Sequence, residues 1–170
     1  MRLILSILLL GVFGLCNSKA DETNDTFTLY LVRHAEKQAD GSRDPALTEA
    51  GRDRAQNLSK WFLGKDISEV WSSDYIRTRE TVRPMAAQLG LSIRIYDPGN
   101  QTELVRQLLD QQHNALVVGH SNTIPELARL LCDCAIADMV ESEHDRLIVI
   151  SIVNGEVSTD TLHQAALFNP

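Results

Sequence analysis

Strand-like and helix-like patterns alternate along most of the chain. Phe27–Val32 and Ala115–Val118 are β-rich runs typical of buried strands, and Leu91–Tyr96 alternates apolar with polar residues like a half-buried strand. Further strand-like runs cover residues 70–73, 146–153 and 156–162, the last two joined by an Asn-Gly turn. Apolar residues at helical spacing predict helices over residues 48–63, 74–90, 101–112 and 124–131.

Local residues suggest where these helices begin and end. Thr48 is placed to cap the first helix, and Asp74 is placed to cap the second. Pro84 falls inside the second helix and is expected to end or kink it. Because strands alternate with helices, we expect an α/β three-layer sandwich, with a mostly parallel central sheet flanked by helices.

The start of the chain has a different pattern. Leu3–Leu15 is almost wholly apolar but shorter than the roughly 20 residues that a membrane-spanning helix needs. We therefore expect a signal peptide over residues 1–20, a loose polar leader over 21–26 and one domain over 27–170. This predicts export to the periplasm or the medium. A lipid anchor at Cys16 and an uncleaved N-terminal anchor are the alternatives.

Composition narrows the class of partner. Lys and Arg total 16 against 23 Asp and Glu, so the chain carries a formal charge of −7 and lacks the basic excess typical of nucleic-acid binders. No later segment is apolar enough to span a membrane. Cys132 and Cys134 lie two apart in a helix-like stretch, so we expect two partly buried thiols, or a local disulfide if the helix ends there.

Three polar clusters follow predicted strands. They are residues 33–36 (RHAE), 72–77 (SSDYIR) and 119–122 (GHSN). Because the carboxyl ends of parallel strands meet at one edge of a sheet, we expect the clusters to converge there. Each cluster alone is more often a surface salt-bridge or turn element; their coincidence at three strand ends favours a site.

Two guanidinium groups and two imidazoles form a site suited to phosphate. An unprotonated imidazole is also able to attack phosphorus, and neighbouring arginines lower the pKa of an imidazole and keep it neutral. The leaving alkoxide then needs a proton from a carboxylic acid.

Four segments, taken in order, resemble motifs of the histidine phosphatase superfamily, also called the phosphoglycerate-mutase-like fold. They are residues 31–37 (LVRHAEK), 47–52 (LTEAGR), 72–81 (SSDYIRTRET) and 117–125 (VVGHSNTIP). The first segment resembles the family's Arg-His-Gly opening, with Ala35 in place of the glycine. The order and spacing match from about Phe27 to Leu131.

The resemblance implies a role for each matching position. His34 would be the catalytic nucleophile that becomes phosphorylated, and Arg33, Arg77 and the catalytic His120 would hold the phosphoryl oxygens. Such enzymes need no metal or other cofactor. The short chain lacks the insertions that enclose a mutase pocket, which favours a phosphatase acting on a phosphate ester or another phosphorylated substrate.

The proton donor is left with three candidates. The family places it after the third strand, where this chain has Asp97 and, a little later, Glu103. Glu36 is the third candidate, unless it holds a neighbouring loop or arginine. Two other functions stay open: a metal-dependent hydrolase that uses His34, His120 and a carboxylate as ligands, and a non-enzymatic anion-binding module on the same fold.

Overall fold

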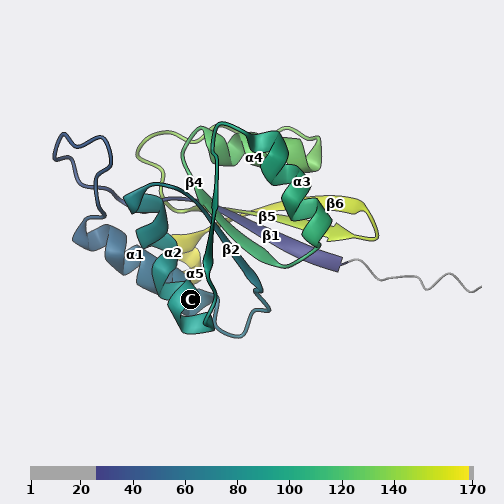
Figure 1. Cartoon of the computed structure of the whole chain (residues 1–170), viewed down its shortest axis with the longest axis horizontal. Helices are drawn as coiled ribbons and strands as arrows, with labels where there is room; N and C mark the ends of the chain where they lie inside the picture. The colour runs from purple at the N-terminus through teal and green to yellow at the C-terminus, as the bar shows by residue number, and fades with distance from the viewer. Residues whose placement is uncertain (1–25, 169–170) are drawn as a thin grey trace, which may run out of the picture.

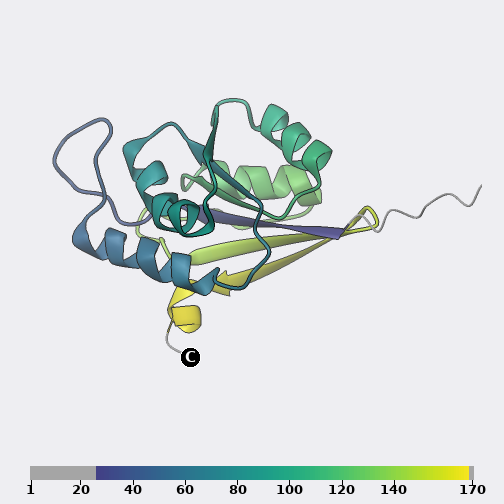
Figure 2. The same cartoon turned by 60° about the horizontal axis from the view of Figure 1, so that its bottom comes forward.

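A six-stranded sheet lies between two layers of helices (Figures 1 and 2). The computed structural model describes residues 26–168, so the predicted signal peptide, Cys16 and nearly all of the leader lie outside the described residues. In chain order the elements are β1 (Thr26–Arg33), α1 (Glu49–Trp61), β2 (Glu69–Ser73), α2 (Ile76–Leu89), β3 (Ile93–Tyr96), α3 (Gln101–Gln111), β4 (Ala115–Gly119), α4 (Thr123–Cys132), β5 (Arg146–Val153), β6 (Glu156–His163) and α5 (Gln164–Phe168).

The strand order is β3-β2-β4-β1-β5-β6. The β1, β2, β3 and β4 strands pair in parallel, whereas β5 runs antiparallel to β1 and β6 antiparallel to β5. The mostly parallel three-layer sandwich is confirmed. The β1–β4 register aligns Arg33 with Gly119, and the β2–β4 register aligns Ser72 with Val118, so three strands end side by side at one edge.

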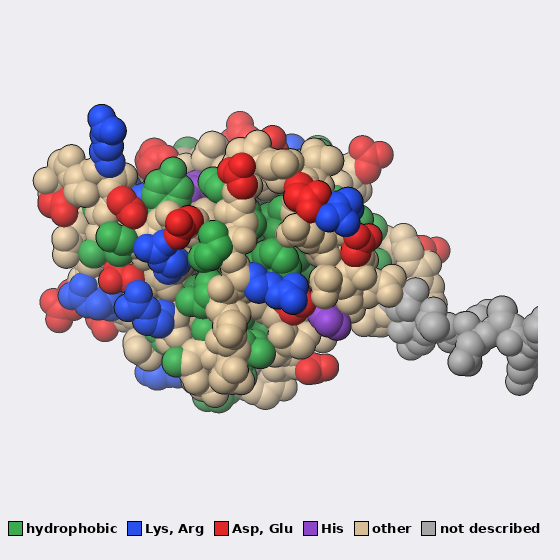
Figure 3. Space-filling model, in the orientation of Figure 1, with side chains coloured by type: hydrophobic (Ala, Val, Ile, Leu, Met, Phe, Trp, Pro, Cys, Tyr) green, Lys and Arg blue, Asp and Glu red, His purple; other side chains and the backbone are tan. Residues whose placement is uncertain are grey.

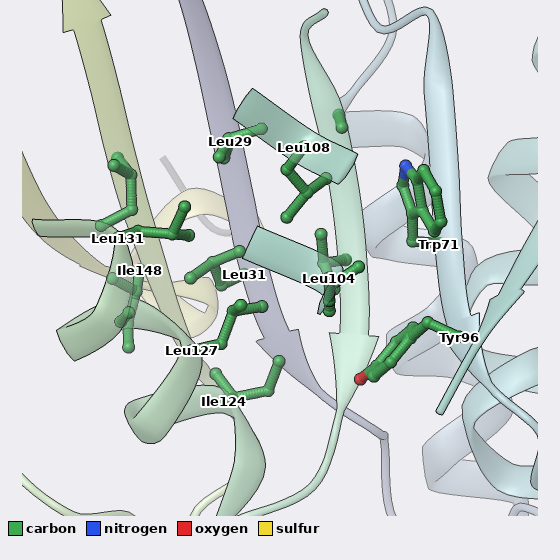
Figure 4. Packing of buried hydrophobic residues seen from close by; sticks show 14 of the residues in the cluster. Leu29, Leu31, Trp71, Tyr96, Leu104, Leu108, Ile124, Leu127, Leu131 and Ile148 are labelled. Atoms are coloured by element: carbon green, nitrogen blue, oxygen red, sulfur yellow. The ribbon is translucent and has the colours of Figure 1, made fainter. Parts of the chain in front are cut away.

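The side chains of β1 alternate between two cores. Leu29 and Leu31 face α3 and α4, while Val32 and the partly buried Tyr30 face α1 and α2. Figure 4 shows the first core, in which α3 and α4 lay their apolar stripes on the sheet through Leu104, Leu108, Ile124, Leu127 and Leu131. Each buried leucine contributes roughly 1.5–3 kcal/mol, which fixes β1, and with it the site at its end.

The start and course of α2 differ from expectation. Its N-cap is Tyr75, not Asp74, and the carboxylate of Asp44 accepts the Ile76 N–H instead. Pro84 does not end the helix, because α2 continues to Leu89, close to the predicted end at residue 90. Val82 and Met85 are buried on either side of the proline, and this packing outweighs the missing backbone donor.

Of the two alternatives for the cysteines, the two partly buried thiols are wrong and the local disulfide is found: Cys132 and Cys134 are bonded, with Cα atoms 5.1 Å apart. The helix ends at Cys132, and Asp133 adopts a left-handed conformation with φ of 48°. This turn brings together two side chains that a continuing helix would hold apart.

The surface in the view of Figure 3 mixes acidic and basic side chains between apolar ones, without a single-sign patch. Among residues 26–168, no helix has both the length and the apolarity to cross a bilayer.

Candidate active site

The three polar clusters meet in one pocket of about 410 Å³ at the shared edge of β1, β2 and β4. The residues that line it are Arg33, His34, Lys37, Tyr75, Arg77, Pro98, Gly99, His120, Ser121, Asn122, Thr123 and Glu141. The structure therefore brings together four predicted site residues: Arg33, His34, Arg77 and His120. Their rings and guanidinium groups supply positive charge and N–H donors suited to an oxyanion.

His34 follows the last residue of β1 and is 3% exposed. Its backbone N–H donates to Gly119 O at 2.9 Å, and its Nδ1 lies 2.8 Å from Ala35 O. Because a carbonyl only accepts, Nδ1 carries the proton and Nε2 keeps its lone pair. Burial, followed by the charges of Arg33 and Arg77, lowers the pKa of His34 to about 3, so the imidazole is neutral at physiological pH.

The nucleophile loop (residues 34–48) is held by contacts that its own motifs supply. Thr48 caps α1 by accepting the Gly51 N–H, and Thr48 N–H donates to Glu36 O at 2.9 Å. A Cβ at Gly51 would lie 2.2 Å from Glu36 O, so only glycine fits there. Ala35, which replaces the family's glycine, needs no positive φ; its N–H donates to Thr81 Oγ1 at 2.9 Å.

Arg33 is 2% exposed and is held by the carbonyl segment (residues 136–145). Its Nη1 donates to the carbonyls of Val140, Glu141 and Glu143 at 2.9, 2.7 and 3.1 Å. Its Nη2 donates to the Glu141 carboxylate at 2.8 Å. These bonds fix the plane of the guanidinium at the pocket wall.

Arg77 and His120 lie against each other. Arg77 Nη1 donates to Asp44 Oδ1 at 3.3 Å, and Nη2 lies 3.4 Å from His120 Nδ1. His120 Nε2 lies 3.0 Å from Ser73 Oγ. Burial, then the charges of Arg77 and Arg33, lowers the pKa of His120 to about 4.

The Nε atoms of Arg33 and Arg77 are buried N–H groups without a hydrogen-bond partner. Buried donors are normally paired, because leaving one unpaired costs about 1–3 kcal/mol. A ligand with several acceptor oxygens would offset that cost, which fits an oxyanion at this pocket.

The three carboxylates predicted as proton donors lie outside the pocket. Asp97 lies in the adjoining pocket, which shares Tyr75 and Pro98 with the site, and accepts the Gly99 N–H at 2.8 Å. Glu103 is exposed on α3 and pairs with Arg106 at 2.6 Å. Glu36 binds Arg54 through Nε and Nη2, so it holds a neighbouring arginine. None of the three carboxylates lines the pocket.

Two nearby residues were not predicted. Glu141 lies at the mouth of the pocket with its side chain 78% exposed, and one carboxylate oxygen accepts from Ser121 Oγ at 2.7 Å. The hydrogen bond with Ser121, then the charge of Arg33, holds its pKa below the usual value. His144 donates from Nδ1 to His34 O at 2.9 Å. Neither residue belongs to a recognisable motif, although both lie just before the strand-like run at 146–153.

The described residues hold no group of three or more His, Cys, Asp or Glu side chains arranged to bind a metal ion. His34 and His120 lie close together, with ring centroids 5.5 Å apart, but no carboxylate completes a ligand set with them.

Comparison with known proteins agrees with this geometry. The family model described as "Histidine phosphatase superfamily (branch 1)" matches residues 29–98, which include Arg33, His34 and Arg77. A probable phosphoglycerate mutase, GpmB of Erwinia tasmaniensis, is 34% identical over 90 residues. That match covers 49% of this chain and only 41% of the relative. This part of the chain is therefore similar to the histidine phosphatase superfamily, through matches that each span less than half of this chain.

Solved structures of histidine phosphatases share the fold. The protein histidine phosphatase SixA, complexed with tungstate, matches with a TM-score of 0.69 and 19% identity, over 83% of this chain and 99% of SixA. The α-ribazole phosphatase of Shigella flexneri matches with a TM-score of 0.68 and 17% identity, over 81% of this chain and 96% of that protein. A mycobacterial glucosyl-3-phosphoglycerate phosphatase in complex with inorganic phosphate matches with a TM-score of 0.66 and 15% identity, over 85% of this chain and 100% of that protein. At these identities the likeness establishes the superfamily fold alone.

Proposed function

We propose that this chain is a phosphatase that hydrolyses phosphate monoesters through a phosphohistidine intermediate on His34. The observation that carries the proposal is the hydrogen bond from His34 Nδ1–H to Ala35 O. It leaves Nε2 unprotonated, in a pocket that also presents Arg33, Arg77 and His120. The phosphatases among the structural neighbours support the same reaction class.

The reaction has two displacements. In the first, His34 Nε2 attacks phosphorus, the ester P–O bond breaks, and the leaving oxygen takes a proton. In the second, water attacks the phosphohistidine and gives a proton back to the group that protonated the leaving oxygen; the P–N bond breaks, and phosphate leaves with His34 neutral again. The two arginines stabilise the charge that gathers on the phosphoryl oxygens in both transition states.

Asp97 is our proposal for the proton donor, because it lines the adjoining cavity and the next residue, Pro98, lines both that cavity and the pocket. We expect Asp97→Asn to lower kcat about tenfold or more with alkyl phosphates, whose leaving groups need a proton, and much less with p-nitrophenyl phosphate. The same substitution at Glu103, which binds Arg106 on α3, is the matched control. Equal losses with both classes of ester would remove Asp97 from this role.

The intermediate is tested by mixing the protein briefly with ³²P-labelled substrate and quenching. We expect label on His34 that is stable in alkali and labile in acid, and none on His34→Ala. The control is His113→Ala, because His113 binds Glu69 away from the pocket. Turnover without label on His34 would contradict the mechanism. Phosphate binding without turnover of any ester would instead support the non-catalytic anion-binding module.

The substrate is to be sought with a panel of phosphorylated compounds. The pocket is lined largely by polar side chains, which suits a polar leaving group next to the phosphate. The panel should include the substrates that the neighbours' names give: a phosphohistidine protein, α-ribazole 5′-phosphate and glucosyl-3-phosphoglycerate. A preference of at least about tenfold in kcat/KM for one class would assign it.

We also propose that the protein is exported. The apolar run Leu3–Leu15 supports this, as does the Cys132–Cys134 disulfide, which suits an oxidising compartment. N-terminal sequencing of protein recovered from its native cell fraction tests it. A mature chain that begins near Asp21 is expected, whereas full-length protein in the cytoplasm would contradict export.

A further inference from the structure

We propose that Ser73 and Thr78 decide which nitrogen of His120 carries its proton, and that they leave Nδ1 unprotonated. When a phosphoryl dianion binds in the pocket, one proton is therefore taken up at Nδ1 of His120. The first half concerns the free protein and stands independently of catalysis. The second half rests on the proposed function, because it needs the pocket to bind an oxyanion. Ser73 and Thr78 are positioning residues in this scheme.

Two buried hydroxyl groups, those of Ser73 and Thr78, lie on the Nε2 side of His120. Thr78 Oγ1 lies 2.8 Å from Ser73 O and 2.9 Å from Tyr75 O. Carbonyls only accept, so the single proton of Thr78 is donated to them. Ser73 Oγ lies 3.2 Å from Thr78 Oγ1 and donates its own proton there. The hydroxyl of Ser73 is then an acceptor toward His120 Nε2, 3.0 Å away. Nε2 therefore carries the proton.

The other ring nitrogen of His120 faces a guanidinium group. His120 Nδ1 faces Arg77 Nη2 at 3.4 Å. A guanidinium has no acceptor, so a proton on Nδ1 would point at another donor. Nδ1 therefore keeps its lone pair. The hydroxyl chain and the arginine assign the same tautomer to His120, from contacts at its two ring nitrogens.

This tautomer sets how the pocket receives a doubly charged oxyanion. An oxyanion beside an unprotonated Nδ1 would face a lone pair, and its charge raises the affinity of the ring for a proton. The charged and titratable groups around His120 come from several elements: Arg33, His34, Asp44, Tyr75, Arg77 and Glu141. In the free protein, burial and the two arginines keep the imidazole neutral at physiological pH. A bound dianion accepts from Arg77 Nη2 in place of Nδ1 and offsets the charge of the arginines. Nδ1 is then free to take up a proton and to hydrogen-bond a phosphoryl oxygen.

The tautomer is tested by ¹⁵N NMR of the ligand-free protein labelled at histidine. We expect His120 to show a protonated Nε2 and an unprotonated Nδ1. Thr78→Val keeps the shape of the side chain but removes the oxygen that accepts the Ser73 proton, so Ser73 then donates to Nε2. In this variant we expect Nδ1 of His120 to be protonated and Nε2 to be unprotonated. Ser72→Ala is the matched control, because the adjacent Ser72 hydroxyl donates to Ser73 O and not to His120. A protonated Nδ1 in the wild-type protein would overturn the proposal.

The proton uptake is tested by calorimetry with tungstate, an oxyanion that stays doubly charged at about pH 7.5. Titrations in two buffers of different ionisation enthalpy should give an uptake of about one proton per tungstate bound. His120→Gln, with both arginines retained, should bind with no uptake. Wild-type binding without uptake would overturn the role of His120 alone. Absence of binding would overturn the oxyanion site, and with it the proposed function.

Discussion

The nucleophile loop and the carbonyl segment both shape the pocket, but they are held in opposite ways. Side-chain and glycine contacts specific to residue type fix the nucleophile loop: the Thr48 cap, the Thr81 hydroxyl and the bare Gly51. The carbonyl segment offers mainly backbone oxygens. Arg129 donates to Ile136 O, Arg146 donates to the carbonyls of residues 137 and 138, and Arg33 donates to three more.

This difference explains which half of the site leaves a trace in the sequence. A contact that needs a hydroxyl or a missing Cβ restricts the residue type, so the nucleophile loop carries motifs. A backbone carbonyl is present on every residue, so the carbonyl segment is restricted only through the arginines that reach it. The following substitutions test this division.

Gly51→Ala should have the largest effect, because the new Cβ would lie 2.2 Å from Glu36 O. We expect the free energy of unfolding to fall by about 2–4 kcal/mol, together with most of the activity. Urea unfolding and phosphatase assays check this. Gly99→Ala is the control for stability alone, because Gly99 lines the pocket; its nearest contact is the Asp97 side chain at 3.2 Å, and the substitution should cost under about 1 kcal/mol. Equal costs would show that the nucleophile loop tolerates the methyl group.

Arg33→Lys should follow, since an ammonium is unable to reach three carbonyls and Glu141 together. We expect roughly a hundredfold loss of kcat/KM and a loss of stability of about 1–3 kcal/mol, from carbonyls left without donors. Arg77→Lys is the comparison, because Arg77 bonds only Asp44 and His120; it should lower activity with less effect on stability. An Arg33→Lys protein as stable as wild type would contradict the holding role of Arg33.

The free energy of unfolding should depend on pH because the imidazoles of His34 and His120 are buried and partly buried, respectively, in the folded protein. The folded-state pKa values of His34 and His120, about 3 and about 4, lie below the unfolded value of about 6.5. The unfolded chain therefore binds more protons between these values. Stability from these groups is complete above about pH 6.5 and falls with pH by up to about 1.4 kcal/mol per unit for each histidine. Urea unfolding across this range should show a shallower slope for His34→Ala. An unchanged slope would mean that His34 titrates normally.

Glu141→Gln should have the smallest effect and the opposite sign. It removes a negative charge at the pocket mouth, while the amide oxygen still accepts from Arg33. We expect the inhibition constant of inorganic phosphate to fall about three- to tenfold at low salt, and less at high salt. Glu103→Gln, on α3 outside the pocket, should leave it unchanged. Weaker phosphate inhibition would indicate that the Glu141 charge is needed to hold Arg33.

Sequence reasoning reached the parallel sheet and the convergence of Arg33, His34, Arg77 and His120, because strand periodicity and strand ends are local signals. It failed where a distant partner decides. Asp44 accepts the first N–H of α2 from a loop 32 residues earlier, so Asp74 looked like the cap. The turn at Asp133 that closes the disulfide depends on backbone conformation at one residue. Glu103 and Arg106 have the i,i+3 spacing of a helical ion pair, so this signal against Glu103 was present in the sequence.

The position of β1 inside the sheet also determines how firmly the backbone at His34 is held. This strand is bonded on both sides, to β4 and to β5, and the His34 amide continues the ladder to Gly119. The His34 imidazole is thus carried at the end of a strand that is paired on both sides, so moving it requires disturbing pairing on two edges of β1.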